Sequence, residues 1–127
     1  MPSISTEEIA ALASRVTGPV FARDSKGLAA EVSGQNLLII HDPDVAVGAA
    51  TENDVVEAVR FASDHALAVN VQATGHGTHD AYDSGLIITT KRIDDVTIDP
   101  ATRTASIGAG ARWSAVVAAA APHGLAP

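Results

Sequence analysis

The residues best suited to chemistry in this sequence lie in one short loop, residues 73–80. The loop places His76 between two glycines, Gly75 and Gly77. Glycine has no Cβ, so the backbone can adopt positive φ there and approach a ligand closely. Successive N–H groups in such a turn form a concave nest that binds anions. The loop therefore predicts an anion site made by the main chain. The His76 side chain is free to point away from the loop.

Other interpretations of the same loop are weaker or remain open. A tight surface turn with an incidental histidine accounts for the same residues, because glycine-rich loops are common. No G-x-G-x-x-G opens a helix and no Walker loop is present, which excludes the Rossmann and P-loop sites. A metal site is disfavoured because the loop lacks the helical spacing that would aim two ligands at one ion. The metal-ligating side chains considered are His76, His79, Asp80 and Asp83. We expect no metal and no catalytic acid or base in this chain.

The charge balance limits how an anion could be held. The 127 residues contain 8 Lys and Arg against 15 Asp and Glu, a formal net charge of -7. Nucleic-acid binding needs clustered cations, so we expect no nucleic-acid partner. A phosphorylated ligand would depend largely on backbone N–H groups. The absence of cysteine excludes disulfides and thiol chemistry. No apolar run is long enough to cross a bilayer and residues 1–5 show no secretory signal, so we expect a cytoplasmic protein without a membrane partner.

A strand–helix–strand unit is predicted to position the loop. Residues 45–48 read as a strand, and Thr51 with Asp54 marks a helix start. Residues 67–72 form a second strand directly before the loop, parallel to the first. Ligands of open α/β sheets bind beyond the carboxyl ends of the strands, which is where this loop lies. The helix is expected to bury the face formed by Val55, Val59, Ala62 and Ala66.

Further elements surround this unit. Ser5 and Glu8 form a capping-box pattern for an N-terminal helix that ends before Gly18. Residues 20–36 read as irregular, 37–40 as a short buried strand, and 86–89 as another strand. Residues 96–98 and 104–107 flank a hairpin turn. A last helix follows Gly110, with Trp113 on its buried face. The predicted fold is α+β, with a βαβ unit, a small mixed sheet and flanking helices.

From Gly18 to its end, the chain resembles the FAD-binding domain of the p-cresol methylhydroxylase (PCMH) and vanillyl-alcohol oxidase superfamily. The most similar branch is that of the bacterial berberine-bridge-enzyme-like oxidases. The resemblance rests on several stretches that occur in the family's order. These are residues 31–36 (EVSGQN), 55–62, 71–77, 90–93, 96–100, 108–113 and 122–125.

The resemblance implies a role for each residue of the loop. It implies that backbone amides of the loop surround the pyrophosphate of FAD, and that His76 is joined covalently to the dimethylbenzene edge of the flavin. The implied cofactor-binding residues are Gln72, Ala73, Thr74, Gly75, His76 and Gly77. Many relatives carry arginine, a small hydroxyl residue and glycine in place of Gln72, Ala73 and Thr74. This chain therefore has less side-chain charge for the pyrophosphate, although amides can compensate.

The resemblance also implies the domain organisation and the activity. Residues 1–40 are interpreted as an N-terminal helix and an irregular lead-in, and residues 41–127 as the N-terminal part of an FAD-binding domain, apparently truncated. The intact parent is expected to be an FAD-dependent oxidoreductase of the oxidase type, which moves a hydride from a C–H bond of a small-molecule substrate to flavin N5. The chain by itself is expected to be inactive. The alternative is a non-enzymatic α/β domain that binds a nucleotide or assembles with a partner.

The remaining polar and aromatic residues have simpler interpretations. Lys91 and Arg92 could reach a phosphate, but Asp94 and Asp95 beside them favour surface ion pairing. Trp113 could stack on a flavin or adenine, but its helical spacing favours a place in the core. Isolated histidines are interpreted as structural, and two serines lack the histidine–acid pairing of a hydrolase. They are His41, His65 and His123, and Ser84 and Ser114.

Overall fold

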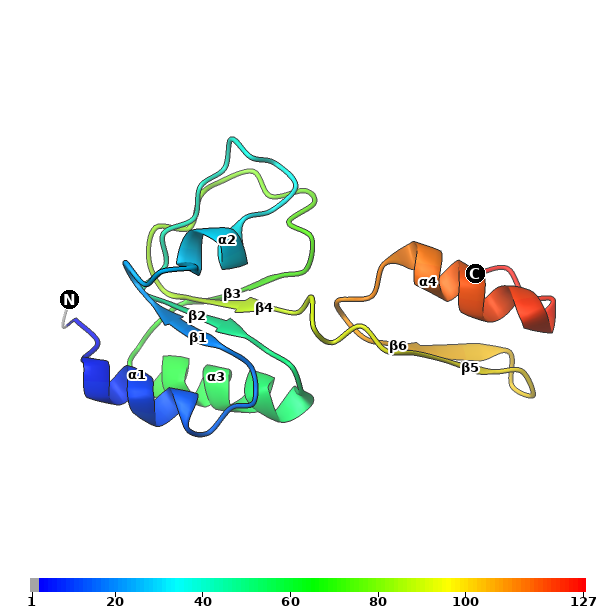
Figure 1. Ribbon diagram of the computed structural model, residues 1–127, viewed down its shortest axis with the longest axis horizontal. Coiled ribbons are helices and arrows are strands. Elements are labelled where there is room, and N and C mark those ends of the chain that lie inside the picture. Colours follow the sequence, from blue (N-terminus) through cyan, green and yellow to red (C-terminus); the bar gives the residue numbers. More distant parts are fainter. Residues whose placement is uncertain (1–2) are drawn as a thin grey trace.

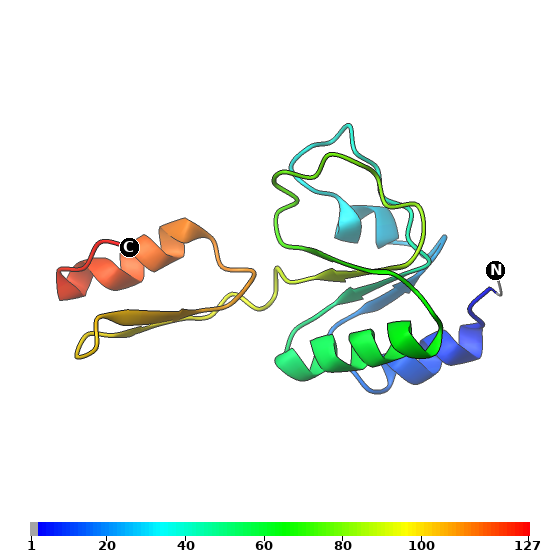
Figure 2. The same cartoon turned by 180° about the vertical axis from the view of Figure 1, so that it is seen from behind.

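A mixed four-stranded sheet with helices on both faces forms one part of the molecule, and a hairpin with one helix forms the other (Figures 1 and 2). The computed structural model describes residues 3–127, so Met1 and Pro2, at the start of the N-terminal stretch discussed above, lie outside it. The sheet has the order β1-β2-β4-β3. Its strands are β1 (Val20–Ala22), β2 (Val45–Gly48), β3 (Val69–Gln72) and β4 (Leu86–Thr89). β1 runs antiparallel to β2, and the other three strands are parallel. The predicted α+β fold with a small mixed sheet is therefore confirmed.

β2, α3 (Glu52–Asp64) and β3 form the predicted strand–helix–strand unit, but β4 lies between its two strands. Both Val45 and Val69 pair with Leu86 in the register of the sheet. All four residues of β4 are buried, as expected for a parallel strand covered on both faces. β3 becomes an edge strand, and the Val71 side chain on it is 65% exposed.

Helices α1 (Thr6–Ala13) and α3 cover one face of this sheet, and α2 (Leu28–Val32) covers the other. Successive side chains of a strand point to opposite faces, so β2 and β4 contribute to two cores. The larger core holds Leu12, Val45, Val47, Ala49, Ala58, Phe61, Ala62, Leu86 and Ile88. The smaller core holds Leu28, Val32, Ala46 and Ile87.

The predicted start of α3 is confirmed, and its predicted buried face is confirmed in part: Ala62 is buried and Val55 packs against the core, whereas Val59 and Ala66 are exposed. Thr51 is the N-cap, and its hydroxyl accepts a hydrogen bond from the Asp54 N–H at 3.1 Å. The Asp54 side chain is fully buried, and Ala58 and Phe61 share its face, whereas Val59 is 45% exposed. Asp54 accepts N–H groups from Thr17, Gly18 and Ala50, and these bonds turn the 54/58/61 face inward.

Two predictions for residues 20–40 are wrong. The segment read as irregular contains β1 and α2. Residues 37–40 do not form a strand, and Leu37, Leu38 and Ile40 are 76%, 91% and 75% exposed. The Asn36 side chain accepts the Leu38 N–H at 3.1 Å, and the Asn36 carbonyl accepts the Ile39 N–H at 3.2 Å. These local bonds hold the backbone in a turn, where an apolar run cannot pair with a sheet.

The second part of the molecule is the predicted hairpin with the last helix. β5 (Val96–Asp99) pairs with β6 (Thr104–Ile107), and the Asp99 carboxylate accepts N–H groups of the turn between them. α4 (Trp113–Ala120) packs against the hairpin and continues into a 3-10 turn, η1 (Ala121–His123). Val116 is fully buried but Trp113 is 57% exposed, so the prediction that Trp113 is a core residue is wrong. Two strands cover only a narrow stripe of a helix, and Trp113 lies outside that stripe.

A close approach of two backbone segments joins the two parts. The Gly110 N–H donates to the Ile93 carbonyl at 2.8 Å, and the Gly108 N–H donates to the Asp95 carbonyl at 2.8 Å. A Cβ on Gly110 would overlap the Thr90 carbonyl, so only glycine allows this passage. The start of α4 is thereby held beside the end of β4.

Candidate functional site

The loop after β3 presents main-chain donors that no group in residues 3–127 accepts. The N–H groups of residues 73–77 have no hydrogen-bond acceptor within the part of the chain that the structure describes. Gly75 and Gly77 have φ of 75° and 81°, so the predicted positive φ is confirmed at both. Unpaired amides in a turn of this kind are suited to an anion.

A second segment, residues 32–35, is fastened to this loop. The Gln35 N–H donates to the Thr74 carbonyl at 2.9 Å. Gly34 packs on Gly75 so closely that a Cβ on Gly75 would lie 2.6 Å from the Gly34 Cα. The Gln72 side chain is buried, and its Nε2 donates to the Val32 carbonyl at 3.0 Å. Sequence reasoning treated residues 20–36 as a lead-in and did not place them at the site, because these contacts join residues about 40 positions apart.

His76 is exposed, and one of its ring nitrogens contacts the same segment. Its Nδ1 lies 2.8 Å from the Gln35 side-chain oxygen. Its Nε2 has no hydrogen-bond partner among the described residues. His76 also borders a small hollow of about 120 Å³ with Ala73, Thr74 and Gly75. The ring is therefore held at Nδ1 by Gln35, while Nε2 is accessible to a ligand.

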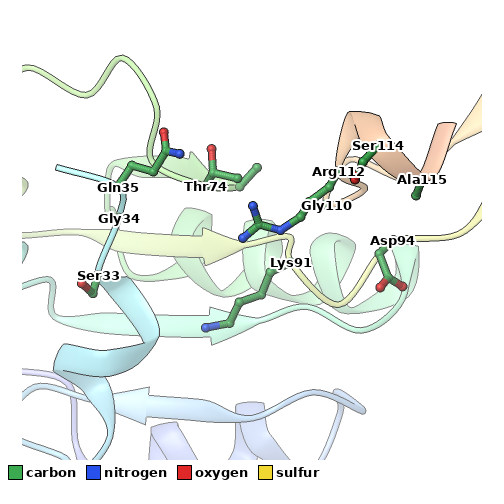
Figure 3. A pocket seen from close by; sticks show the side chains of 11 residues that line it. Ser33, Gly34, Gln35, Thr74, Lys91, Asp94, Gly110, Arg112, Ser114 and Ala115 are labelled. Atoms are coloured by element: carbon green, nitrogen blue, oxygen red, sulfur yellow. The ribbon is translucent and has the colours of Figure 1, made fainter. Parts of the chain in front are cut away.

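A larger cavity of about 510 Å³ lies where the loop, residues 33–35, the end of β4 and the start of α4 meet (Figure 3). Ala73 and Thr74 border this cavity as well as the smaller hollow. The cavity lies beyond the carboxyl ends of β3 and β4, the position expected for a ligand site in a parallel sheet.

Two cations enter this cavity. Lys91 follows β4, and Arg112 is the N-cap residue of α4. Figure 3 shows the Arg112 side chain reaching from the start of α4 toward Thr74. Among the described residues no side chain caps α4, and the N–H groups of Trp113 and Ser114 have no acceptor there, whereas the Ala115 N–H donates to the Arg112 carbonyl at 3.0 Å. Sequence reasoning missed Arg112, because only the approach of residues 108–110 to residues 90–95 brings it to the loop.

The position of Lys91 depends on a buried carboxylate on α2. Glu31 is 6% exposed and accepts two hydrogen bonds from Arg92, at 2.7 and 2.9 Å. Its carboxylate also accepts the Thr89 hydroxyl and lies 3.3 Å from the Lys91 Nζ. The Arg92 hydrogen bonds, and then the Thr89 and Lys91 contacts, outweigh burial and lower the pKa of Glu31 to about 2. The expectation that Arg92 pairs with its neighbours Asp94 and Asp95 is wrong, since its partner lies 61 residues away.

The other candidate residues do not join this cavity. His41 stacks on Tyr82 and accepts its N–H at 3.0 Å, and His65 stacks on Phe61 and contacts Glu8 at 3.1 Å. These two histidines are structural, as predicted. Within residues 3–127, no three histidine, aspartate or glutamate side chains converge on a point that could hold a metal ion. In the same range, no helix has the length and apolar character needed to cross a bilayer.

Comparison with known proteins relates this chain to FAD-binding domains and to an oxidoreductase. Residues 43–127 match the family model described as "FAD binding domain". An uncharacterized oxidoreductase, ORF5 of the fasciation locus of Rhodococcoides fascians, is 39% identical over 79 residues, which are 61% of this chain and 18% of that protein.

The fold also matches solved structures. The 6-hydroxy-D-nicotine oxidase of Arthrobacter nicotinovorans superposes with a TM-score of 0.72 at 28% identity, over 87% of this chain and 25% of that one. The carbohydrate oxidase of Microdochium nivale superposes with a TM-score of 0.74 at 20% identity, over 89% of this chain and 25% of that one. The chain thus spans about a quarter or less of the length of these relatives.

Proposed function

We propose, from the fact that this chain belongs to the FAD binding domain family, that its loop 73–77 and the adjoining cavity hold the pyrophosphate of FAD. The observation that carries the proposal is the run of unpaired N–H groups in this loop, beside a cavity that Lys91 and Arg112 enter. A diphosphate accepts hydrogen bonds and donates none, so it complements the donors of the loop, Lys91 and Arg112, while Asp94 is an acidic residue on the same cavity wall.

The donor set fits this group in an acidic chain. Backbone amides supply the contacts that require no net charge, and Thr74 adds a hydroxyl. Lys91 and Arg112 supply the positive charge. This charge compensates for the arginine that many relatives carry at the position of Gln72 and that this chain lacks. The Gln72 side chain acts on the site indirectly, because its donor is engaged by Val32 and holds the two segments together.

We further propose that His76 forms a covalent bond to the flavin. His76 would hold the flavin through a bond from one ring nitrogen to a methyl carbon of the dimethylbenzene edge, formed in place of one C–H bond with loss of a proton. Dioxygen would take up the two electrons released and become hydrogen peroxide. The exposed ring of His76 supports this proposal, because its Nε2 has no hydrogen-bond partner within residues 3–127.

When bound, FAD supplies the hydride acceptor that the side chains of this chain lack. We propose that the whole protein is an FAD-dependent oxidoreductase of the oxidase type, acting on a small-molecule substrate. The oxidase names of the two solved relatives support this proposal. The residues of this chain bind and orient the cofactor, and none of them is assigned to move a substrate proton.

Titration of the purified 127-residue chain with FAD and with riboflavin tests the pyrophosphate site. Riboflavin has the same ring system but no phosphate. We expect Arg112→Gln and Lys91→Met each to weaken FAD binding about tenfold, since a hydrogen bond to a charged group contributes about 1.5–3 kcal/mol. The two variants should leave riboflavin binding unchanged. Flavin fluorescence quenching reports both affinities.

Matched controls are Arg60→Gln and Lys26→Met, because neither residue borders the cavity. An unmodified chain that binds FAD no more tightly than riboflavin would contradict the proposal. Equal loss of both ligands in the Arg112 and Lys91 variants would also contradict it. A chain that binds ADP as tightly as FAD would favour a plain nucleotide-binding domain.

A further inference from the structure

The contact between Gln35 and His76 fixes more than the position of the ring. Neutral imidazole carries its proton on one nitrogen and a lone pair on the other, and a hydrogen bond to one nitrogen selects between the two forms. In this structure the His76 Nδ1 faces the side-chain oxygen of Gln35 at 2.8 Å. A carboxamide oxygen can only accept, so Nδ1 must be the nitrogen that carries the hydrogen.

Gln35 is held in place by the backbone on both sides of this contact. Its own N–H donates to the Thr74 carbonyl at 2.9 Å. The preceding residue, Gly34, packs against Gly75, the residue before His76. The side-chain contact between Gln35 and His76 therefore adds to two backbone contacts that already join residues 34–35 to residues 74–75. The backbone of Gln35 is therefore already ordered, and only its side-chain rotamers lose freedom when it meets the imidazole.

We infer that Gln35 is a positioning residue that holds His76 in the Nδ1–H tautomer and so leaves Nε2 as the nitrogen with the free lone pair. The inference deepens the proposed covalent attachment and rests on it for its functional meaning. It assigns Nε2 as the nitrogen that bonds to the flavin, and it gives Gln35 the role of selecting that nitrogen.

The tautomer can be measured in the full chain without any cofactor. Long-range ¹H–¹⁵N correlation spectra of the histidine-labelled protein, recorded at about pH 8.5, distinguish the protonated from the unprotonated nitrogen of a neutral imidazole ring. We expect the Nδ1–H form to dominate for His76. Finding the proton mainly on Nε2 in the unmodified chain would overturn the inference without the need for any variant.

Two substitutions distinguish the effect of the Gln35 side chain on the tautomer from the effect of the backbone contacts. Gln35→Leu keeps the N–H bond to Thr74 but removes the acceptor, and we expect the ratio of Nδ1–H to Nε2–H to fall about fivefold, the effect of one ordinary hydrogen bond. Gln35→Glu retains an acceptor of similar reach and should restore the Nδ1–H form. An unchanged ratio in Gln35→Leu, or a loss in Gln35→Glu equal to that in Gln35→Leu, would contradict the role of Gln35.

A control variant tests whether general loosening of the segment explains the effect. The absence of cofactor makes the tautomer test independent of the proposed function. Asn36→Ala removes the neighbouring amide, which bonds to Leu38 and not to His76, and should leave the ratio unchanged. A change in Asn36→Ala equal to that in Gln35→Leu would show that general loosening of the segment causes the effect, and would overturn the inference. Because no FAD is present, this outcome is independent of the flavin titration that tests the proposed function.

Discussion

Gly34 and Gly75 lie Cα against Cα, so that a Cβ on Gly75 would come within 2.6 Å of the Gly34 Cα. The two residues belong to segments about 40 positions apart, and their contact brings Gln35 to Thr74 and His76. Together with the Gln35–Thr74 and Gln72–Val32 hydrogen bonds, this contact holds the loop that we propose binds the pyrophosphate. The two glycines of that loop therefore differ in the room for a side chain, because a Cβ on Gly77 would lie in open space.

Gly75→Ala should therefore be considerably more damaging than Gly77→Ala. Both residues have positive φ, which costs about 1–2 kcal/mol with a side chain present. Only Gly75 adds a backbone clash, and we expect a total loss of about 2–4 kcal/mol in the free energy of unfolding. Urea unfolding of the two variants gives the comparison. Equal destabilisation would show that the Gly34 contact contributes nothing.

Glu31→Gln should destabilise the protein near neutral pH and flatten its response to acid. The lowered pKa of about 2 means that ionised Glu31 stabilises the folded state fully above its ordinary value of 4.5, and that this stability is lost as the pH falls toward 2. We expect a loss of about 2–3 kcal/mol at pH 7 in Glu31→Gln, because Arg92 then lacks its carboxylate partner. Unfolding measured at several pH values gives both curves.

The two curves should approach each other as the pH falls toward 2, since a growing fraction of the unmodified Glu31 is then protonated. Glu52→Gln is a suitable control, because Glu52 is an exposed carboxylate at the start of α3. A constant difference between Glu31→Gln and the unmodified chain from pH 7 to pH 2 would contradict the role of the ion pair.

Asp54→Asn should loosen the attachment of the chain after α1 to α3. Burial alone would raise the pKa of Asp54, but the N–H groups of Thr17, Ala50 and Gly18 lower it further than burial raises it. An asparagine keeps one acceptor and presents a donor to the remaining N–H groups. We expect a loss of about 2–3 kcal/mol, typical of hydrogen bonds to a charged group. Thermal unfolding checks this value, and a change below about 0.5 kcal/mol, the range of neutral surface substitutions, would show that the bonds contribute little.

Leu38→Ser should have almost no effect on stability, although leucine lies in the most apolar stretch of its region. Its side chain is 91% exposed, so we expect a change within about 0.5 kcal/mol. Ile87→Ala, in the fully buried strand β4, should cost about 2–5 kcal/mol. Chemical unfolding of both variants distinguishes the turn at residues 36–40 from a buried strand. A large loss in Leu38→Ser would favour the strand.

Signals that act over a few residues were enough to predict much of the fold. Ser5 and Glu8 cap α1 reciprocally and Thr51 caps α3, as their spacing indicated, and the predicted hairpin turn forms with Asp99 as the acceptor of its N–H groups. These bonds form within three residues, so their energies are already present in the local chain. The family resemblance also predicted the cofactor, because it depends on the order of stretches along the chain and not on their contacts.

Local patterns in the sequence predict the α+β class, the position of the glycine loop after a parallel strand, and the positive φ of Gly75 and Gly77. Long-range contacts place β4 between β2 and β3, pair Glu31 with Arg92, bring Gln35 to His76 and bring Arg112 to the cavity. Each of these contacts joins residues about 40 or more positions apart or depends on two segments docking. Their energies exist only after long loops have closed, so no local pattern can encode them.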